Sequence, residues 1–179
     1  RPGVNLALDA GATIAGTVTG PGGPIPGATV SAVGPDGAGF SAAADGSGCY
    51  GVGRLGSGLH TVYARAPGFV ATSVPSISVP AAGTVTGVDI ELAPAGGIAG
   101  TFTDASSGAP VESVIVSTSL GSDLYVTTTD ADGRFALTEL PPGDYPVVTS
   151  SDNHMTTHTT CTVAAGVTAT LDLALPLFG

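Results

Sequence analysis

An internal duplication is the feature of this 179-residue sequence that most restricts its fold. Ile14 matches Ile98 at a spacing of 84, and the same spacing relates Pro26 to Pro110 and Val30 to Val114. Later matches have a spacing of 85: Asp45 to Asp130, Gly48 to Gly133, Tyr50 to Phe135, Leu55 to Leu140 and Gly58 to Gly143. A repeat of this length predicts two copies of one folding unit. We place the copies at residues 13–94 and 96–179, after an N-terminal strand and linker at residues 1–12.

Each copy alternates short apolar runs with turn residues. Phe135 and Leu137 alternate with Arg134 and Ala136, which is typical of a strand with one apolar face. Pro141-Pro142-Gly143 then interrupts the strand pattern. The 28 glycines and 14 prolines beside 42% apolar residues favour many short strands joined by turns. We therefore predict an all-β protein of two tandem Ig-like or transthyretin-like Greek-key β-sandwiches, preceded by an orphan N-terminal strand.

The turn and core motifs resemble a known family. The stretches are GTVTGPGGPIPGATVSAVG and DGSGCYGVGRLGSGLHTVYARAPGF in the first copy, and GTFTDASSGAPVESVIVS and TTTDADGRFALTELPPGDYPV in the second. They resemble the carboxypeptidase regulatory-like domain, a transthyretin-like and CnaB-like sandwich. The resemblance implies the fold but no single function, since such modules act as spacers, stabilisers or binding units. A related sandwich family forms Lys–Asn isopeptide crosslinks, which this chain excludes because it has no lysine.

Two loops depart from the family pattern. Gly56-Ser57-Gly58 stands where the family favours Pro-Pro-Gly, and Asn153-His154 stands where a Gly-aromatic pair such as Gly68-Phe69 is usual. We expect any individual activity to reside in loops of this kind.

The charge balance excludes several partners. Charged residues make up 10% of the chain and its net charge is -10, so it repels nucleic acid and anionic lipid. No apolar run approaches the roughly 20 residues that span a bilayer, so no membrane insertion is predicted. The composition favours an extracellular or cell-surface location.

Three motifs that suggest chemistry have simpler interpretations. Asp130-Ala131-Asp132 begins like a calcium loop, but residue 141, where an EF-hand needs glutamate, is proline, so we predict a β-turn. The G-x-G-x-x-G match at 51–56 lacks the βαβ unit that a nucleotide site requires. Asp152, His154 and His158 have metal-ligand chemistry, but residues four apart in a strand lie roughly 13 Å apart. We predict no catalytic residue, cofactor or metal site, and no enzyme.

The two cysteines, Cys49 and Cys161, occupy non-equivalent positions of the copies, which excludes the bridge that would staple one sandwich. An interdomain disulfide, an intermolecular disulfide and two free thiols remain as alternatives. The intermolecular bridge is favoured over the interdomain one, because distant points of tandem sandwiches rarely approach the roughly 6 Å between Cα atoms that a disulfide needs.

The N-terminal residues Val4, Leu6 and Leu8 repeat the pattern that closes each copy, at Val88, Ile90 and Leu92 and again at Leu171, Leu173 and Leu175. This strand is either the remnant of a preceding unit or a subunit-contact strand that adds to a sheet edge of another molecule. The second interpretation predicts a non-catalytic extracellular structural protein whose partners are copies of itself, joined head to tail into a filament or surface layer. The alternative is an accessory binding or spacer module, with a carbohydrate or protein ligand, in a larger secreted hydrolase or adhesin.

Overall fold

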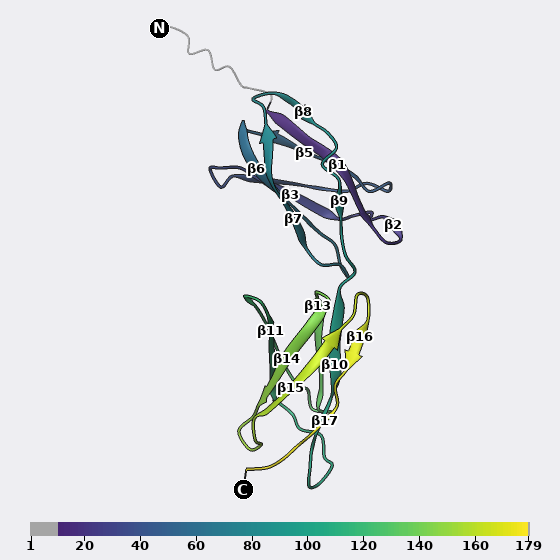
Figure 1. The fold of residues 1–179 in the computed structure, drawn as a ribbon, viewed down its shortest axis with the longest axis vertical. Helices are drawn as coiled ribbons and strands as arrows, with labels where there is room; N and C mark the ends of the chain where they lie inside the picture. The colour runs from purple at the N-terminus through teal and green to yellow at the C-terminus, as the bar shows by residue number, and fades with distance from the viewer. Residues whose placement is uncertain (1–10, 179) are drawn as a thin grey trace. The chain divides into compact units, whose positions relative to one another are not determined.

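The computed structural model describes residues 11–178, and every regular element within them is a β-strand (Figure 1). The chain divides between Ala93 and Pro94 into two compact units, called unit 1 and unit 2 below. Each unit has two sheets that enclose its own apolar core. The prediction of tandem all-β sandwiches is confirmed.

In unit 1, strand β1 organises one sheet and β3 and β6 form the centre of the other. The first sheet pairs β1 (Ala12–Gly20) antiparallel with β2 (Gly23–Pro24) and β5 (Cys49–Leu55), and parallel with β8 (Gly83–Val85) and β9 (Ile90–Glu91). The second sheet has the order β4 (Gly39–Ala43), β3 (Thr29–Val33), β6 (Gly58–Arg65), β7 (Thr72–Val79), all antiparallel.

Unit 2 repeats this arrangement. The first sheet pairs β10 (Gly96–Asp104) antiparallel with β13 (Arg134–Leu140), and parallel with β16 (Thr168–Thr170) and β17 (Leu173–Leu175). The second sheet has the order β12 (Asp123–Thr128), β11 (Ile115–Leu120), β14 (Gly143–Ser150), β15 (Thr157–Val163).

Alternation along the strands supplies the cores. In β13, Phe135 and Leu137 are buried while Arg134 and Ala136 are exposed, as the sequence predicts. Phe135 packs against Phe102 of β10 with ring centroids 4.6 Å apart. Burial of such side chains stabilises each unit by roughly 1.5–3 kcal/mol per residue.

The closing segment of each unit lies against the first strand of the same unit. β9 pairs with β1 and β17 pairs with β10, and Ile90 and Leu175 are buried there. The approach is close: a Cβ added to Gly16 would lie 2.0 Å from the Val88 carbonyl oxygen, and one added to Gly100 would lie 1.9 Å from that of Leu171. Only glycine fits at these two positions.

The structure corrects part of the duplication register. Thr19 pairs with Pro24 and Thr103 with Pro110, so the partner of Pro110 is Pro24 and the predicted match with Pro26 is wrong. Likewise, the pairings of Val30 with Ala64 and Val116 with Thr149 show that the predicted match of Val30 with Val114 is wrong. The physical reason is a longer turn in unit 2, where residues 104–109 replace residues 20–23.

Candidate functional site

The predicted subunit-contact residues Val4, Leu6 and Leu8 lie outside the described residues. Cys49 is exposed at the start of β5, and Cys161 is buried in β15, opposite Tyr145. Both cysteines are free thiols in the structure. Burial raises the pKa of the Cys161 thiol, which reduces its reactive thiolate fraction.

The aspartate motifs form turns, as predicted. The Asp45 carboxylate accepts hydrogen bonds from the backbone N–H groups of Ser47 at 2.8 Å and Cys49 at 2.9 Å. In unit 2, the Asp130 carboxylate accepts the equivalent bonds from Asp132 and Arg134 at 2.9 and 2.8 Å. These carboxylates are therefore occupied in holding the β-turns that precede β5 and β13.

The glycine-rich run at residues 51–56 lies in β5 and the turn that follows it. No three histidine, cysteine, aspartate or glutamate side chains within residues 11–178 are placed to hold one metal ion. Asp152 and His158 are exposed, whereas His154 is buried and turned toward a different residue.

That residue is Asp104, and sequence reasoning missed the pair. His154 Nε2 lies 3.1 Å from Asp104 Oδ2, and both side chains are about nine-tenths buried. Asp104 Oδ1 also accepts hydrogen bonds from the backbone and hydroxyl groups of Ser106 and Ser107. The Ser106 and Ser107 hydroxyl bonds and the Ser107 backbone bond, with a smaller effect of His154, hold the Asp104 pKa well below its usual range.

The equivalent positions of unit 1 show what this pair replaces. Phe69 stands where His154 stands and Gly20 where Asp104 stands, and an added Cβ at Gly20 would lie 2.9 Å from the Phe69 ring. Where unit 1 packs an aromatic ring against glycine, unit 2 therefore places an imidazole against a carboxylate. Because His154 also forms a bridge with Leu177, the pair fastens the loop at 151–154 and the chain at 176–178 to the turn after β10.

The outer face of unit 2 carries exposed apolar side chains beside a sheet edge that no other strand of residues 11–178 pairs with. β12 is the edge strand, and its Leu124 and Val126 are 70% and 54% exposed. Ile115 of β11 is 46% exposed, and the register places all three on the same face of the sheet. We call these three residues the β12 apolar face.

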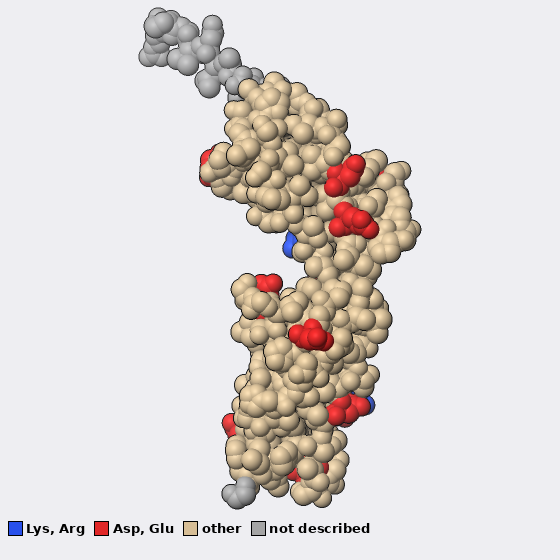
Figure 2. Space-filling model, in the orientation of Figure 1, with Lys and Arg blue, Asp and Glu red and all other residues tan. Residues whose placement is uncertain are grey.

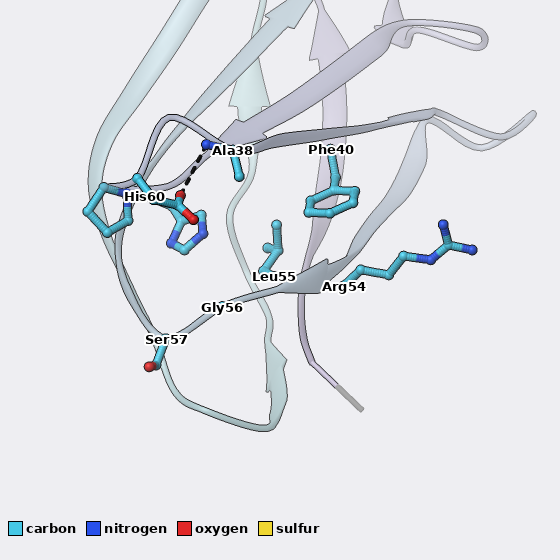
Figure 3. A pocket seen from close by; sticks show the side chains of 9 residues that line it. Ala38, Phe40, Arg54, Leu55, Gly56, Ser57 and His60 are labelled. Atoms are coloured by element: carbon cyan, nitrogen blue, oxygen red, sulfur yellow. Dashed lines mark hydrogen bonds between the residues drawn. The ribbon is translucent and has the colours of Figure 1, made fainter. Parts of the chain in front are cut away.

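Unit 1 contains a hollow of about 430 Å³ (Figure 3). His60 of β6 lies on one side of it, Arg54 of β5 on the other, and Phe40 of β4 and Leu55 between them. The loop at 34–38 and the turn at 56–57 complete its wall; the lining residues are Pro35, Asp36, Ala38, Phe40, Arg54, Leu55, Gly56, Ser57 and His60.

His60 is the most buried polar group of this hollow, at 3% exposure. Its Nδ1 lies 3.3 Å from the Gly58 carbonyl oxygen, which can only accept, so a hydrogen bond there requires the tautomer with its proton on Nδ1. A Cβ at Gly34 would lie 2.9 Å from Nε2 and 3.1 Å from Asp36 Oδ1. The bare glycine therefore leaves space beside each of these two polar atoms that a side chain at position 34 would fill.

The two sandwiches match one known domain family. The model of the carboxypeptidase regulatory-like domain matches residues 13–93 and again 97–176. The chain belongs to the carboxypeptidase regulatory-like domain family. A search of curated proteins found no match.

Several solved structures of bacterial proteins are similar to this chain over most of its length. GBS52, the minor pilin of Streptococcus agalactiae, is 13% identical with a TM-score of 0.48, over 94% of this chain and 97% of that one. The shaft pilin SpaA of Lactobacillus rhamnosus GG is 11% identical with a TM-score of 0.44, over 94% and 98%. The Bacillus anthracis TIE protein is 13% identical with a TM-score of 0.44, and 94% of this chain covers 34% of its length. Identities of this size carry no information on function.

Proposed function

We propose that this chain is a non-catalytic structural module of an extracellular or cell-surface protein, and that it associates with copies of itself. The N-terminal residues Val4, Leu6 and Leu8 act as the donated strand, so that successive molecules join head to tail into a filament or layer. The observation that carries this proposal is the β12 apolar face beside a free sheet edge.

A donated strand must add to an edge, because β9 and β17 already occupy the closing positions of their own units. β12 is suited to receive it: within residues 11–178 its outer edge pairs with no other strand, and Leu124 and Val126 offer apolar contacts on one face. A strand added there presents its alternate residues to the same face. Burial of three such side chains contributes roughly 5–9 kcal/mol before the entropy of ordering is subtracted, at about 1.5–3 kcal/mol each.

The surface also supports close packing between copies. Figure 2 shows acidic side chains scattered singly over both units, with few basic ones between them. Many carboxylates serve turns: Asp45, Asp104 and Asp130 each accept backbone N–H groups. A surface of small, mostly uncharged side chains has little charge to desolvate when it is covered.

The test is light scattering with negative-stain electron microscopy on the full chain, on a deletion of residues 1–9, and on Val126→Asp. The matched control is Leu59→Asp, which alters an exposed leucine of β6 in unit 1. We expect assemblies from the full chain and the control, and monomers from the deletion and Val126→Asp. Monomers from the full chain, or assemblies that survive both changes, refute the donated strand. If reductant dissolves the assemblies, a disulfide through the exposed Cys49 also links neighbouring molecules.

The second candidate function is an accessory binding module of a larger secreted hydrolase or adhesin. The hollow of unit 1 favours it, because concave sites lined by apolar surface and a few polar groups are where small ligands bind. The two functions are compatible, since the β12 apolar face and the hollow belong to different units.

A further inference from the structure

We propose that the hollow of unit 1 binds one neutral hexopyranose ring. The inference is independent of self-association, and it is carried by the contrast between the hollow and the same place in unit 2.

In unit 2 the position that corresponds to the hollow is filled by side chains. Tyr125 and Tyr145 correspond by register to Phe40 and His60, and their rings pack edge to face with centroids 6.1 Å apart. Leu120 covers the same region, with its methyl groups 3.3–3.5 Å from where a Cβ at Gly143 would lie. Tyr145 is fully buried and its hydroxyl donates to the Pro141 carbonyl oxygen at 2.8 Å. No polar group of Tyr145 is left facing a cavity.

Unit 1 has the same strands, but different side chains stand at the equivalent positions. Phe40 lacks a hydroxyl and is 37% exposed, and an imidazole stands in place of the buried phenol. The connection between β3 and β4 is the loop at 34–38, where unit 2 has only the tight turn at 121–122 between the paired Leu120 and Asp123. The longer loop brings Asp36 to the rim, and the hydrogen bond from Ala38 N–H to Asp36 Oδ1 at 3.1 Å holds it there (Figure 3).

Backbone strain does not distinguish the two units. Arg54 has a φ of 65°, and Glu139 at the same bulge of unit 2 has 59°, so this conformation belongs to the fold. What differs is the side chain: Arg54 is one of the residues that line the hollow of unit 1, and unit 2 has Glu139 at this position. The polar lining of the hollow is therefore particular to unit 1.

The chemistry of the lining selects a hydroxylated ring. Phe40 and Leu55 offer an apolar surface to a ring's C–H face, while His60 Nε2 and the Asp36 carboxylate accept hydrogen bonds from hydroxyl groups. A sugar hydroxyl donates to such acceptors, so a pyranose can satisfy them while its C–H face covers the apolar surface. The net charge of -10 and Asp36 disfavour an anionic sugar, which makes the ligand neutral.

The experiment is NMR titration of the full chain with glucose, galactose, mannose and N-acetylglucosamine, each to about 50 mM, a range that detects millimolar affinity. We expect at least one sugar to shift resonances of the hollow, with unit 2 as the internal control. Asp36→Asn and Phe40→Ala should each weaken binding about tenfold, since each removes one principal contact. Tyr63→Ala is the matched aromatic control: Tyr63 is 49% exposed on the opposite face of the same sheet, and its loss should leave binding unchanged.

Unaltered amide spectra of unit 2 and of the β1–β5 pair verify that each variant is folded. No shift with any of the four sugars overturns the proposal. So does binding that survives both Asp36→Asn and Phe40→Ala, or binding that Tyr63→Ala abolishes. The N-terminal deletion should bind as the full chain does, so that failure of sugar binding and failure of self-association are separate results.

Discussion

Replacement of Gly100 by alanine tests how tightly the closing segment holds unit 2 together. The new Cβ would lie 1.9 Å from the Leu171 carbonyl oxygen, where ordinary contact begins at 3.4 Å. The obstacle is backbone, so relief requires the segment at 171–175 to move by about 1.5 Å. That displacement breaks the bond from Leu171 N–H to the Ala99 carbonyl, which is 2.9 Å long, and disturbs the pairing of β17 with β10.

The expected cost follows from those contacts. Loss of two or three backbone hydrogen bonds at about 1 kcal/mol each lowers the free energy of unfolding of unit 2 by about 2–3 kcal/mol. For a unit of this size the corresponding change in Tm is about 15 °C. Hydrogen exchange followed by mass spectrometry on the full chain reads each unit separately. We expect faster exchange in β10, β13 and β17, with unit 1 unchanged.

Two further variants make the test specific. Gly16→Ala repeats the same clash in unit 1, 2.0 Å from the Val88 carbonyl oxygen, and should move the loss of protection to β1, β5 and β9. Gly46→Ala adds a Cβ with no atom within 4 Å, and should change stability by less than about 0.5 kcal/mol. If Gly100→Ala unfolds like the unaltered protein, the closing strand does not hold unit 2 and the reasoning fails.

The remaining predictions concern single polar groups. Because bonds from Ser106 and Ser107 lower the Asp104 pKa, this carboxylate stabilises unit 2 above about pH 4, and the stabilisation is lost as acid protonates it. Thermal melts of unit 2 between pH 2 and 6 should therefore depend less on pH in Asp104→Asn, whereas Asp152→Asn, at an exposed loop, should behave as the unaltered protein does. Tyr50 donates to the Val88 carbonyl at 2.6 Å, and burial, with a smaller effect of Asp89, raises its pKa to about 12. Absorbance titration should find one tyrosine ionising near that pH, and Tyr50→Phe should remove this ionisation. The variant should also lower the free energy of unfolding of unit 1 by about 1 kcal/mol. Identical titration curves for the unaltered protein and the variant would contradict this assignment. Iodoacetamide at pH 8 should label exposed Cys49 at least about tenfold faster than buried Cys161, as peptide mass spectrometry measures, and equal rates would show that β15 opens readily.

Local chemistry made much of the fold predictable. The alternation of Phe135 and Leu137 with polar neighbours, and the Asp–Gly turns at 45–48 and 130–133, appear in the structure where the sequence places them. These features depend on residues within a few positions of one another. Because the sequence is duplicated, each of these patterns occurs twice. A pattern that is present in both copies is a property of the fold.

Features that depend on contacts between residues far apart along the chain could not be predicted from the sequence. The register error at Pro26 and Val30 arose because the longer turn at 104–109 shifts the following strand without changing its residue types. Asp104 and His154 lie 50 positions apart, and only their contact reveals the role of the Asn153-His154 departure. A signal was available: both residues fall where the second copy departs from the first. The hollow of unit 1 likewise could not be predicted from the sequence, since Phe40 and His60 lie on different strands.

The parallel pairing of first and last strands has a mechanical consequence. The chain enters unit 1 along β1 and leaves it along β9, and the two strands lie side by side in the same direction. Tension between the two ends pulls them along their length in opposite senses. The pairs Val18–Ile90 and Thr19–Glu91 and the Asp89–Thr17 bonds are then sheared together and cannot peel apart one by one. The same holds for β10 and β17 in unit 2. Single-molecule pulling should find two high-force unfolding events, because each unit resists tension between its two ends through bonds that break together.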